Sequence, residues 1–179
     1  VRVPVANRIG EENKGWTYAK FLLTHERTGI AGVARSKKGL ARLKEIAKAE
    51  YIDGRPLFED QDFARKIAEL EIDLTALEYT DLRVLAELRK GNHPGPESSI
   101  LKIKGTEIQQ RLTELTLEAV GTYAAPFYRG LDDRWNEFPV GPDYAVGSAP
   151  KYFNMRKTSI YGGSNEIQRN IIAKAVLGL

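Results

Sequence analysis

The sequence predicts an all-α protein, an antiparallel four-helix bundle with up-down-up-down topology. Two observations lead to this prediction. Apolar residues recur three or four positions apart over several long segments of the 179-residue chain, which is the spacing of one helix face. Short turns that contain glycine or proline separate these segments, and one long excursion interrupts them, as in an antiparallel bundle.

The first helix is expected over residues 16–50. Its apolar stripe consists of Leu22, Ile30, Val33, Leu40 and Leu43. Three glycines, Gly29, Gly32 and Gly39, lie inside this segment. A glycine in a helix interior costs up to about 1 kcal/mol, so we expect these three to mark close packing against a neighbour.

Two more long helices are expected after it. A turn at residues 51–56 leads into a helix over residues 57–90, and a second turn at residues 91–96 ends that helix. The third helix begins near Glu97 and fades around Gly121. Their inward residues are expected to be Phe63, Ile67, Leu70, Leu74, Leu77, Leu85, Leu88, Leu101, Ile108, Leu112 and Leu115.

The remaining segments differ in character. Glycines and prolines concentrate in residues 124–150, which we expect to form a long ordered loop. A final helix is expected to begin at Ser164, whose hydroxyl is a favourable amino-terminal cap. That helix carries Ile167, Ile171 and Ala175 on one face.

The first residues have a different pattern. Residues 1–12 alternate apolar and polar side chains before a glycine, like the end of a strand or its exit loop. We therefore expect residues 1–12 to be the remnant of a β-domain with its linker, and residues 13–179 to be the helical bundle. The chain is thus expected to begin within a longer protein.

Composition argues against several kinds of site and partner. The chain has no cysteine, so disulfides, thiolate metal sites and cysteine nucleophiles are excluded. The net charge of +3 comes from interspersed charges and not from a one-signed stripe, so no nucleic-acid partner is expected. No apolar run approaches the roughly 20 residues of a membrane span, and a cytoplasmic location is expected. His25 and His93 lack the spacing of a metal site, and we predict none.

Glu26 is a candidate general base. Leu22 precedes it and Gly29 and Ile30 follow it at spacings that share one helix face. A carboxylate in an apolar stripe is partly desolvated, and desolvation raises the pKa of a carboxyl group and suits it to act as a base. The alternative, more frequent on spacing alone, is a structural carboxylate that pairs with Arg27 or a neighbouring helix.

The segment from Gly162 to Asn165 is a candidate ligand site. Its two glycines form a turn that leads into a helix amino terminus, a geometry that can receive phosphate or other polar groups. Taken alone, such a turn is more often only a helix cap.

Three stretches resemble one family. Residues 160–169, Ile-Tyr-Gly-Gly-Ser-Asn-Glu-Ile-Gln-Arg, strongly resemble the Ile-Tyr-Glu-Gly-Thr-x-Glu/Gln-Ile-Gln-Arg motif of acyl-CoA dehydrogenases. Residues 1–16 resemble the link from that family's middle β-domain to its carboxy-terminal bundle. Residues 23–27, Leu-Thr-His-Glu-Arg, resemble the start of the first bundle helix. The resemblance covers nearly the whole chain and implies the family's carboxy-terminal bundle fold.

The resemblance implies FAD as cofactor and an acyl-CoA thioester as substrate. In the family's reaction a carboxylate removes the α-proton while the β-hydrogen leaves as hydride to the flavin. Most members place this base in Tyr-Glu-Gly, where the present chain has Gly162. Other members place it on the first bundle helix before an arginine, where this chain has Glu26 and Arg27. We therefore assign the base to Glu26 and a hydrogen bond to the thioester carbonyl to the backbone N–H of Gly162.

Further residues are assigned by the same resemblance. Ser164 and Glu166 match the side of the FAD site that a subunit provides for itself, and Arg27 matches an arginine near the CoA moiety. Two elements by which a neighbouring subunit completes the site are degraded. Residues 50–54, Glu-Tyr-Ile-Asp-Gly, stand in place of Arg-x-x-Phe-Gly, and residues 116–122 stand in place of Gln-x-x-Gly-Gly-x-Gly.

These departures bear on partners. We expect a homo- or hetero-oligomer, and the degraded elements favour a heteromer like the large subunit of two-subunit, pimeloyl-CoA-type dehydrogenases. A non-catalytic scaffold subunit, or a flavin oxidase or hydroxylase of the same fold, is the alternative function. The chain alone is expected to fold without turning over acyl-CoA, because the family's other domains form most of the flavin and acyl pockets.

Overall fold

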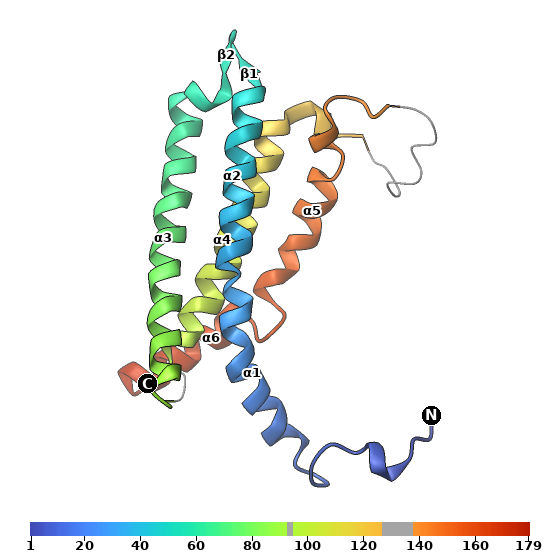
Figure 1. The fold of residues 1–179 in the computed structure, drawn as a ribbon, viewed down its shortest axis with the longest axis vertical. Coiled ribbons are helices and arrows are strands. Elements are labelled where there is room, and N and C mark those ends of the chain that lie inside the picture. Colours follow the sequence, from blue (N-terminus) through green and yellow to red (C-terminus); the bar gives the residue numbers. More distant parts are fainter. Residues whose placement is uncertain (93–94, 127–137) are drawn as a thin grey trace.

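The computed structural model of the chain describes residues 1–92, 95–126 and 138–179, apart from the side chains of residues 24–28 (Figure 1). Within this part the α-helices are α1 (Gly15–Ala31), α2 (Val33–Ala49), α3 (Gln61–Arg89), α4 (Glu97–Val120), α5 (Ser148–Met155) and α6 (Asn165–Ile172). A π-helical turn, Ala173–Leu177, continues α6, and strands β1 (Tyr51–Ile52) and β2 (Arg55–Pro56) form a small hairpin. The all-α prediction is confirmed.

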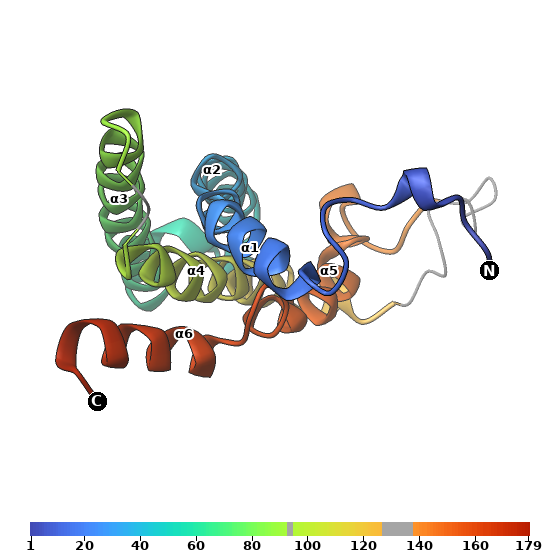
Figure 2. The ribbon, with the colours of Figure 1, turned by 90° about the horizontal axis from the view of Figure 1, so that it is seen from below.

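The helices form an antiparallel bundle. Helices α1 and α2 follow one another up one arm, α3 returns beside them, α4 rises through the centre and α5 descends again (Figure 1). The predicted up-down-up-down topology is thus confirmed, with α5 as the short fourth arm. Helix α6 lies across the foot of the bundle, as Figure 2 shows from below.

Helix α4 is the centre of the packing. Helices α1, α2, α3, α5 and α6 all pack against it, and 14 of its 24 residues are buried. The predicted inward residues that lie in the core are Leu40, Leu43, Phe63, Ile67, Leu70, Leu74, Leu77, Leu101, Ile108, Leu112 and Leu115. Leu22 and Leu85 do not join them, since they are 57% and 40% exposed.

The single helix predicted over residues 16–50 is in fact two helices. Gly32 separates α1 from α2 with a left-handed φ of 61°, a conformation that glycine adopts without strain. A side chain at Gly39 would collide with the side chain of Leu112, so the predicted close packing is confirmed there. Gly29 has open space around it and contributes no such contact within the described part of the chain.

Two segments near the carboxy terminus also differ from the prediction. The loop predicted over residues 124–150 ends early, because α5 already begins at Ser148; within it, residues 127–137 lie outside the described residues. Pro150 suggests a loop in the sequence, but it lies in the first turn of α5, where proline is tolerated. The cap at Ser164 is confirmed, but Ile167 on α6 is 52% exposed, so this residue of the predicted apolar face turns away from the bundle.

The amino-terminal segment contains no strand. Residues 1–12 carry a 3-10 turn at Val5–Asn7 and are exposed throughout. Of the two predicted alternatives, a strand end or an exit loop, the structure has the loop.

The far end of the bundle, near the hairpin, is tied together by Tyr144. Its hydroxyl donates a hydrogen bond of 2.7 Å to Glu50 Oε1, which joins the segment before α5 to the end of α2. The guanidinium of Arg42 lies 5.5 Å from the centre of the Tyr144 ring. Burial and the carboxylate of Glu50 raise the pKa of Tyr144 to about 12. Glu50 is therefore already engaged within its own chain.

The raised pKa of Tyr144 predicts a loss of stability at alkaline pH. The unfolded chain releases the tyrosine proton near a pKa of about 10, whereas the folded protein holds it to about 12. The contribution of Tyr144 to the free energy of unfolding should be constant below about pH 10 and should fall from about pH 10 to about 12. Tyr144→Phe should remove this part of the alkaline loss in urea unfolding between pH 9 and 12. An identical pH slope in the variant would contradict the prediction.

Candidate functional site

The candidate site lies at the foot of the bundle, where the glycine turn before α6 meets the end of α1. Gly162 and Gly163 have φ values of +70° and +89°, which favour glycine. A Cβ at Gly162 would lie 2.8 Å from Cδ1 of Ile30, and one at Gly163 would lie 2.6 Å from Nε2 of Gln168. The turn therefore packs directly on the last turn of α1 and offers backbone groups instead of side chains.

Helix α6 begins with a polar pair. The Ser164 Oγ accepts a hydrogen bond of 3.4 Å from the backbone N–H of Ile167 and so caps the helix. The backbone N–H of Glu166 and the hydroxyl of Ser164 both donate to the Glu166 carboxylate and lower its pKa. Glu166, exposed in the first turn of α6, thus presents an ionised carboxylate, which the helix dipole also favours.

A buried polar cluster fastens this turn to α4. Lys102 is fully buried, and its ammonium donates a 2.7 Å hydrogen bond to Oδ1 of Asn165, the first residue of α6. The hydroxyl of Thr106 lies 3.3 Å from the same oxygen. Burial lowers the pKa of Lys102, and the nearby carboxylate of Glu166 opposes that shift. Within the described part of the chain, Asn165 is the residue that accepts from this ammonium.

This cluster was not predicted from the sequence. Lysine and asparagine in helices are usually solvent-exposed, so the sequence does not indicate that Lys102 and Asn165 are buried partners. The available signal was the small residues three and four positions away on the same helix face, Ser98, Ser99, Gly105 and Thr106, which let a neighbouring helix approach.

The predicted residues Glu26 and Arg27 lie on α1. Helix α1 places position 26 one helical turn before Ile30 and on the same face, which is the face that meets the glycine turn. The side chains of Glu26, Arg27 and His25 lie outside the described residues, as does the whole of His93. The structure thus brings Ile30, one helical turn after position 26, against the glycine turn, and the predicted role of Glu26 stays a prediction.

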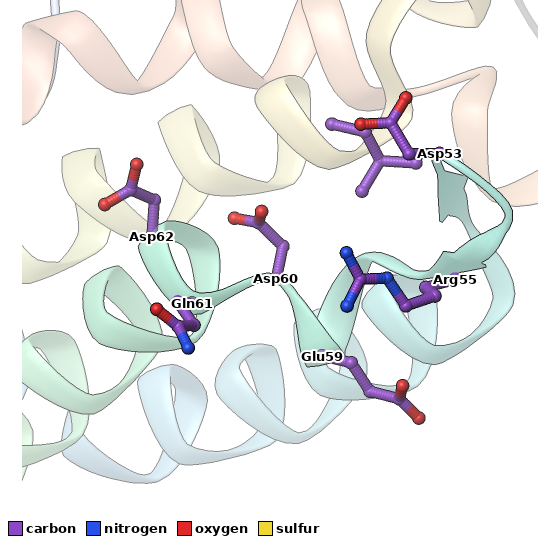
Figure 3. Close-up of a pocket in the computed structure, with 7 residues that line it drawn as sticks. Asp53, Arg55, Glu59, Asp60, Gln61 and Asp62 are labelled. Atoms are coloured by element: carbon purple, nitrogen blue, oxygen red, sulfur yellow. The ribbon is translucent and has the colours of Figure 1, made fainter.

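A hollow at the other end of the molecule has a different character. It measures about 400 Å³ and is lined by Ile52, Asp53, Arg55, Glu59, Asp60, Gln61 and Asp62 (Figure 3). Asp60 already caps α3, because its Oδ1 accepts a 2.8 Å hydrogen bond from the backbone N–H of Phe63. The hairpin beside this hollow lies opposite the foot of the bundle (Figure 1), so the hollow is separate from the candidate site.

The described residues contain neither a metal-binding cluster nor a membrane-spanning helix. No group of three or more histidine, aspartate or glutamate side chains among them is arranged to hold a metal ion. No helix in the same residues is both long enough and apolar enough to cross a membrane.

The bundle and its glycine turn define a class of protein. Residues 13–177 match the family model described as "Acyl-CoA dehydrogenase, C-terminal domain". The chain therefore belongs to the acyl-CoA dehydrogenase family.

Individual relatives agree with this assignment. Acyl-CoA dehydrogenase FadE26 of Mycobacterium tuberculosis is 27% identical over 190 residues, which cover 100% of this chain and 44% of the relative. The ChsE4–ChsE5 complex of the same organism gives a TM-score of 0.73 at 29% identity, covering 99% of this chain and 44% of its counterpart. The FAD complex of PigA gives a TM-score of 0.76 at 21% identity, with 99% and 42% covered. The chain thus spans less than half the length of these relatives.

The buried cluster predicts a specific pattern of stability changes. Asn165→Ala would leave the buried Lys102 amine without its described acceptor, so the free energy of unfolding should fall by about 2–3 kcal/mol. Adding Lys102→Met removes the stranded amine, so the double variant should lose less than Asn165→Ala alone. Denaturant unfolding of the wild type, both single variants and the double variant measures this. An equal or greater loss in the double variant would show that the cluster is not coupled in this way.

Proposed function

We propose that this chain is the carboxy-terminal domain of a flavin-dependent acyl-CoA dehydrogenase subunit, with Glu26 as the base that removes the α-proton of an acyl-CoA thioester. The observation that carries the proposal is the contact between Gly162 and Ile30. It puts Gly162 against the residue one helical turn after position 26, and of the two positions at which the resemblance locates the family's base only position 26 has a carboxylate. Residues 1–12 are proposed as the link to the middle domain of the same protein.

The proposed chemistry divides between the chain and its cofactor. Bound FAD would accept the β-hydrogen as hydride. The Glu26 carboxylate would take the α-proton, so that the two hydrogens leave as a proton and a hydride and a double bond forms between the two carbons. The backbone N–H of Gly162 would donate to the thioester oxygen, where negative charge develops as the α-proton leaves. A backbone donor suits this place because the turn at Gly162 disfavours a side chain.

The start of α6 fits part of FAD. Ser164 and Glu166 form an acceptor-rich pair with an ionised carboxylate. Such a pair fits the hydroxyl or amino groups of the cofactor and disfavours its phosphates, because like charges repel. We propose that these two residues hold a hydroxyl or amino part of FAD and that Arg27 lies near the CoA moiety.

The native assembly is proposed to be heteromeric. Glu50, at the position where the family's neighbouring subunit offers an arginine, is bound to Tyr144 of its own chain at 2.7 Å. A carboxylate there is unsuited to the FAD pyrophosphate of a second copy. A related subunit would then supply the missing half of the flavin site, and the similarity to the ChsE4–ChsE5 complex supports this choice.

The assignment of the base predicts the behaviour of Glu26→Gln. In the full-length protein with its partner and FAD, this variant should bind acyl-CoA but reduce the flavin about 10²–10⁴-fold more slowly, because only the proton acceptor is lost. Stopped-flow bleaching of the flavin absorbance measures the rate. Glu45→Gln serves as the control, since Glu45 is an exposed carboxylate of α2 paired with Lys48 at 3.1 Å, and it should leave the rate unchanged.

The other outcomes identify the alternatives. An unchanged rate of flavin reduction in Glu26→Gln would mean that the base lies elsewhere. If the assembly still oxidises acyl-CoA when the flavin site of this chain is disabled, the chain is a non-catalytic scaffold subunit. Rapid reoxidation of the reduced flavin by oxygen would favour an oxidase or hydroxylase.

The assembly itself predicts how flavin is retained. The full-length protein should hold FAD only when it is produced together with a related dehydrogenase subunit, because its own Glu50 cannot complete a second flavin site. The ratio of flavin to protein absorbance, measured with the mass of the purified complex, tests this. A homo-oligomer with one FAD per subunit would rule the heteromer out.

A further inference from the structure

The junction between α1 and α2 interrupts the helical segment that carries Glu26. Helix α1 ends at Ala31 and α2 starts at Val33, with Gly32 between them at φ 61°. An interruption leaves the last carbonyl groups of α1 without partners in their own helix. Ala31 is fully buried, so water is not available to satisfy the groups around it.

Gln109 of α4 supplies one missing hydrogen bond. Its side-chain Nε2 donates to the backbone carbonyl of Ile30 over 3.0 Å. The same nitrogen would lie only 2.9 Å from a Cβ at position 32, so the amide occupies the space that Gly32 leaves open. Gln109 therefore binds the free carbonyl of Ile30 and fills the space beside Gly32 that a larger residue would occupy.

Gly105, one turn earlier on α4, sets how close the two helices lie. A Cβ there would be 2.6 Å from Cα of Ala31 and 2.7 Å from its carbonyl oxygen. These are backbone atoms, which cannot rotate away as the end of a side chain can. The absence of a side chain at Gly105 thus allows α4 to touch the backbone of α1 at its last residue.

The same two turns of α4 hold the other half of the candidate site. Lys102 and Thr106 bind Asn165 at the start of α6, while Gly105 and Gln109 bind the end of α1. Ile30, whose carbonyl Gln109 holds, also contacts the glycine turn through its side chain. Residues 102–109 of α4 are therefore a common support for α1 and α6.

We infer that Gln109 is a positioning residue for the dehydrogenation: by capping the Ile30 carbonyl it fixes the last turn of α1, and with it Glu26, relative to the Gly162 turn. The inference rests on the proposed role of Glu26. Gln109 acts through the backbone of α1, to which its amide is hydrogen-bonded, and not on the substrate itself. Its loss should therefore slow proton removal more than it weakens acyl-CoA binding.

The test uses Gln109→Met in the full-length protein with its partner and FAD. Methionine keeps the length of the side chain and loses the donor. The probe is the member of a straight-chain series, from butyryl-CoA to palmitoyl-CoA, that bleaches the wild-type flavin fastest. A displacement of about 1 Å at a reacting group lowers rates by about 10²-fold, so we expect flavin reduction to slow about 10- to 100-fold, with the apparent Kd for acyl-CoA changed less than about twofold.

A second readout does not depend on activity. Hydrogen exchange of backbone amides in peptides that cover the end of α1 should speed up in Gln109→Met, because the helix end loses an anchor. The control is Ile67→Val, which trims a buried core residue of α3 away from the site. It should lower the melting temperature to a similar degree and leave both flavin reduction and the exchange of α1 unchanged.

The outcomes separate this inference from the proposed function. Retained flavin reduction in Glu26→Gln would overturn the proposed base itself. An inactive Glu26→Gln with a normal rate in Gln109→Met, or an equal slowing in Ile67→Val, would overturn the positioning role alone. If Gln109→Met does not accumulate, Gln109→Glu replaces it: a protonated carboxyl can donate to Ile30 and a carboxylate cannot. Its rate relative to wild type should rise as pH falls, and a constant ratio would overturn the role.

Discussion

The burial of α4 on almost every side is the constraint on which the rest of the structure depends. The other five helices of the described chain pack against it, so each must fit the shape and polarity of one central surface. Gly105 shows how strict this requirement is, since even one additional carbon would collide with the backbone of Ala31. The polar residues of α4 face the same demand, because Lys102 and Gln109 are buried and have to find partners on neighbouring helices.

Much of the fold could be predicted from local sequence patterns. Leu74 and Leu112 lie inside because a repeat of three and four residues defines one face of a helix whatever lies opposite. The interruption at Gly32 could not be predicted in this way. A glycine in a helical stripe is compatible with a continuous helix, and Gln109, which caps the interruption, lies on a distant segment of the sequence.

The candidate site divides along the same line. The turn at Gly162 and the cap at Ser164 could be identified because short motifs have local geometry. The partnership of Lys102 with Asn165 joins residues 63 positions apart, and each residue alone has an ordinary polar character. Periodicity also could not show that Ile167 faces away from the bundle, because an apolar stripe does not reveal which surface will cover it.

The shared support of α1 and α6 has a mechanical consequence. The end of α1 and the start of α6 are both held by one continuous stretch of hydrogen-bonded helix. This stretch of α4, from Lys102 to Gln109, is about 10 Å long. A rigid translation or tilt of α4 carries the two halves along together and leaves their separation the same. Only stretching or unwinding inside those two turns changes it, and such distortion breaks backbone hydrogen bonds. The distance between the end of α1 and the start of α6 is therefore set by one short segment of α4, and movements of the outer helices leave it unchanged.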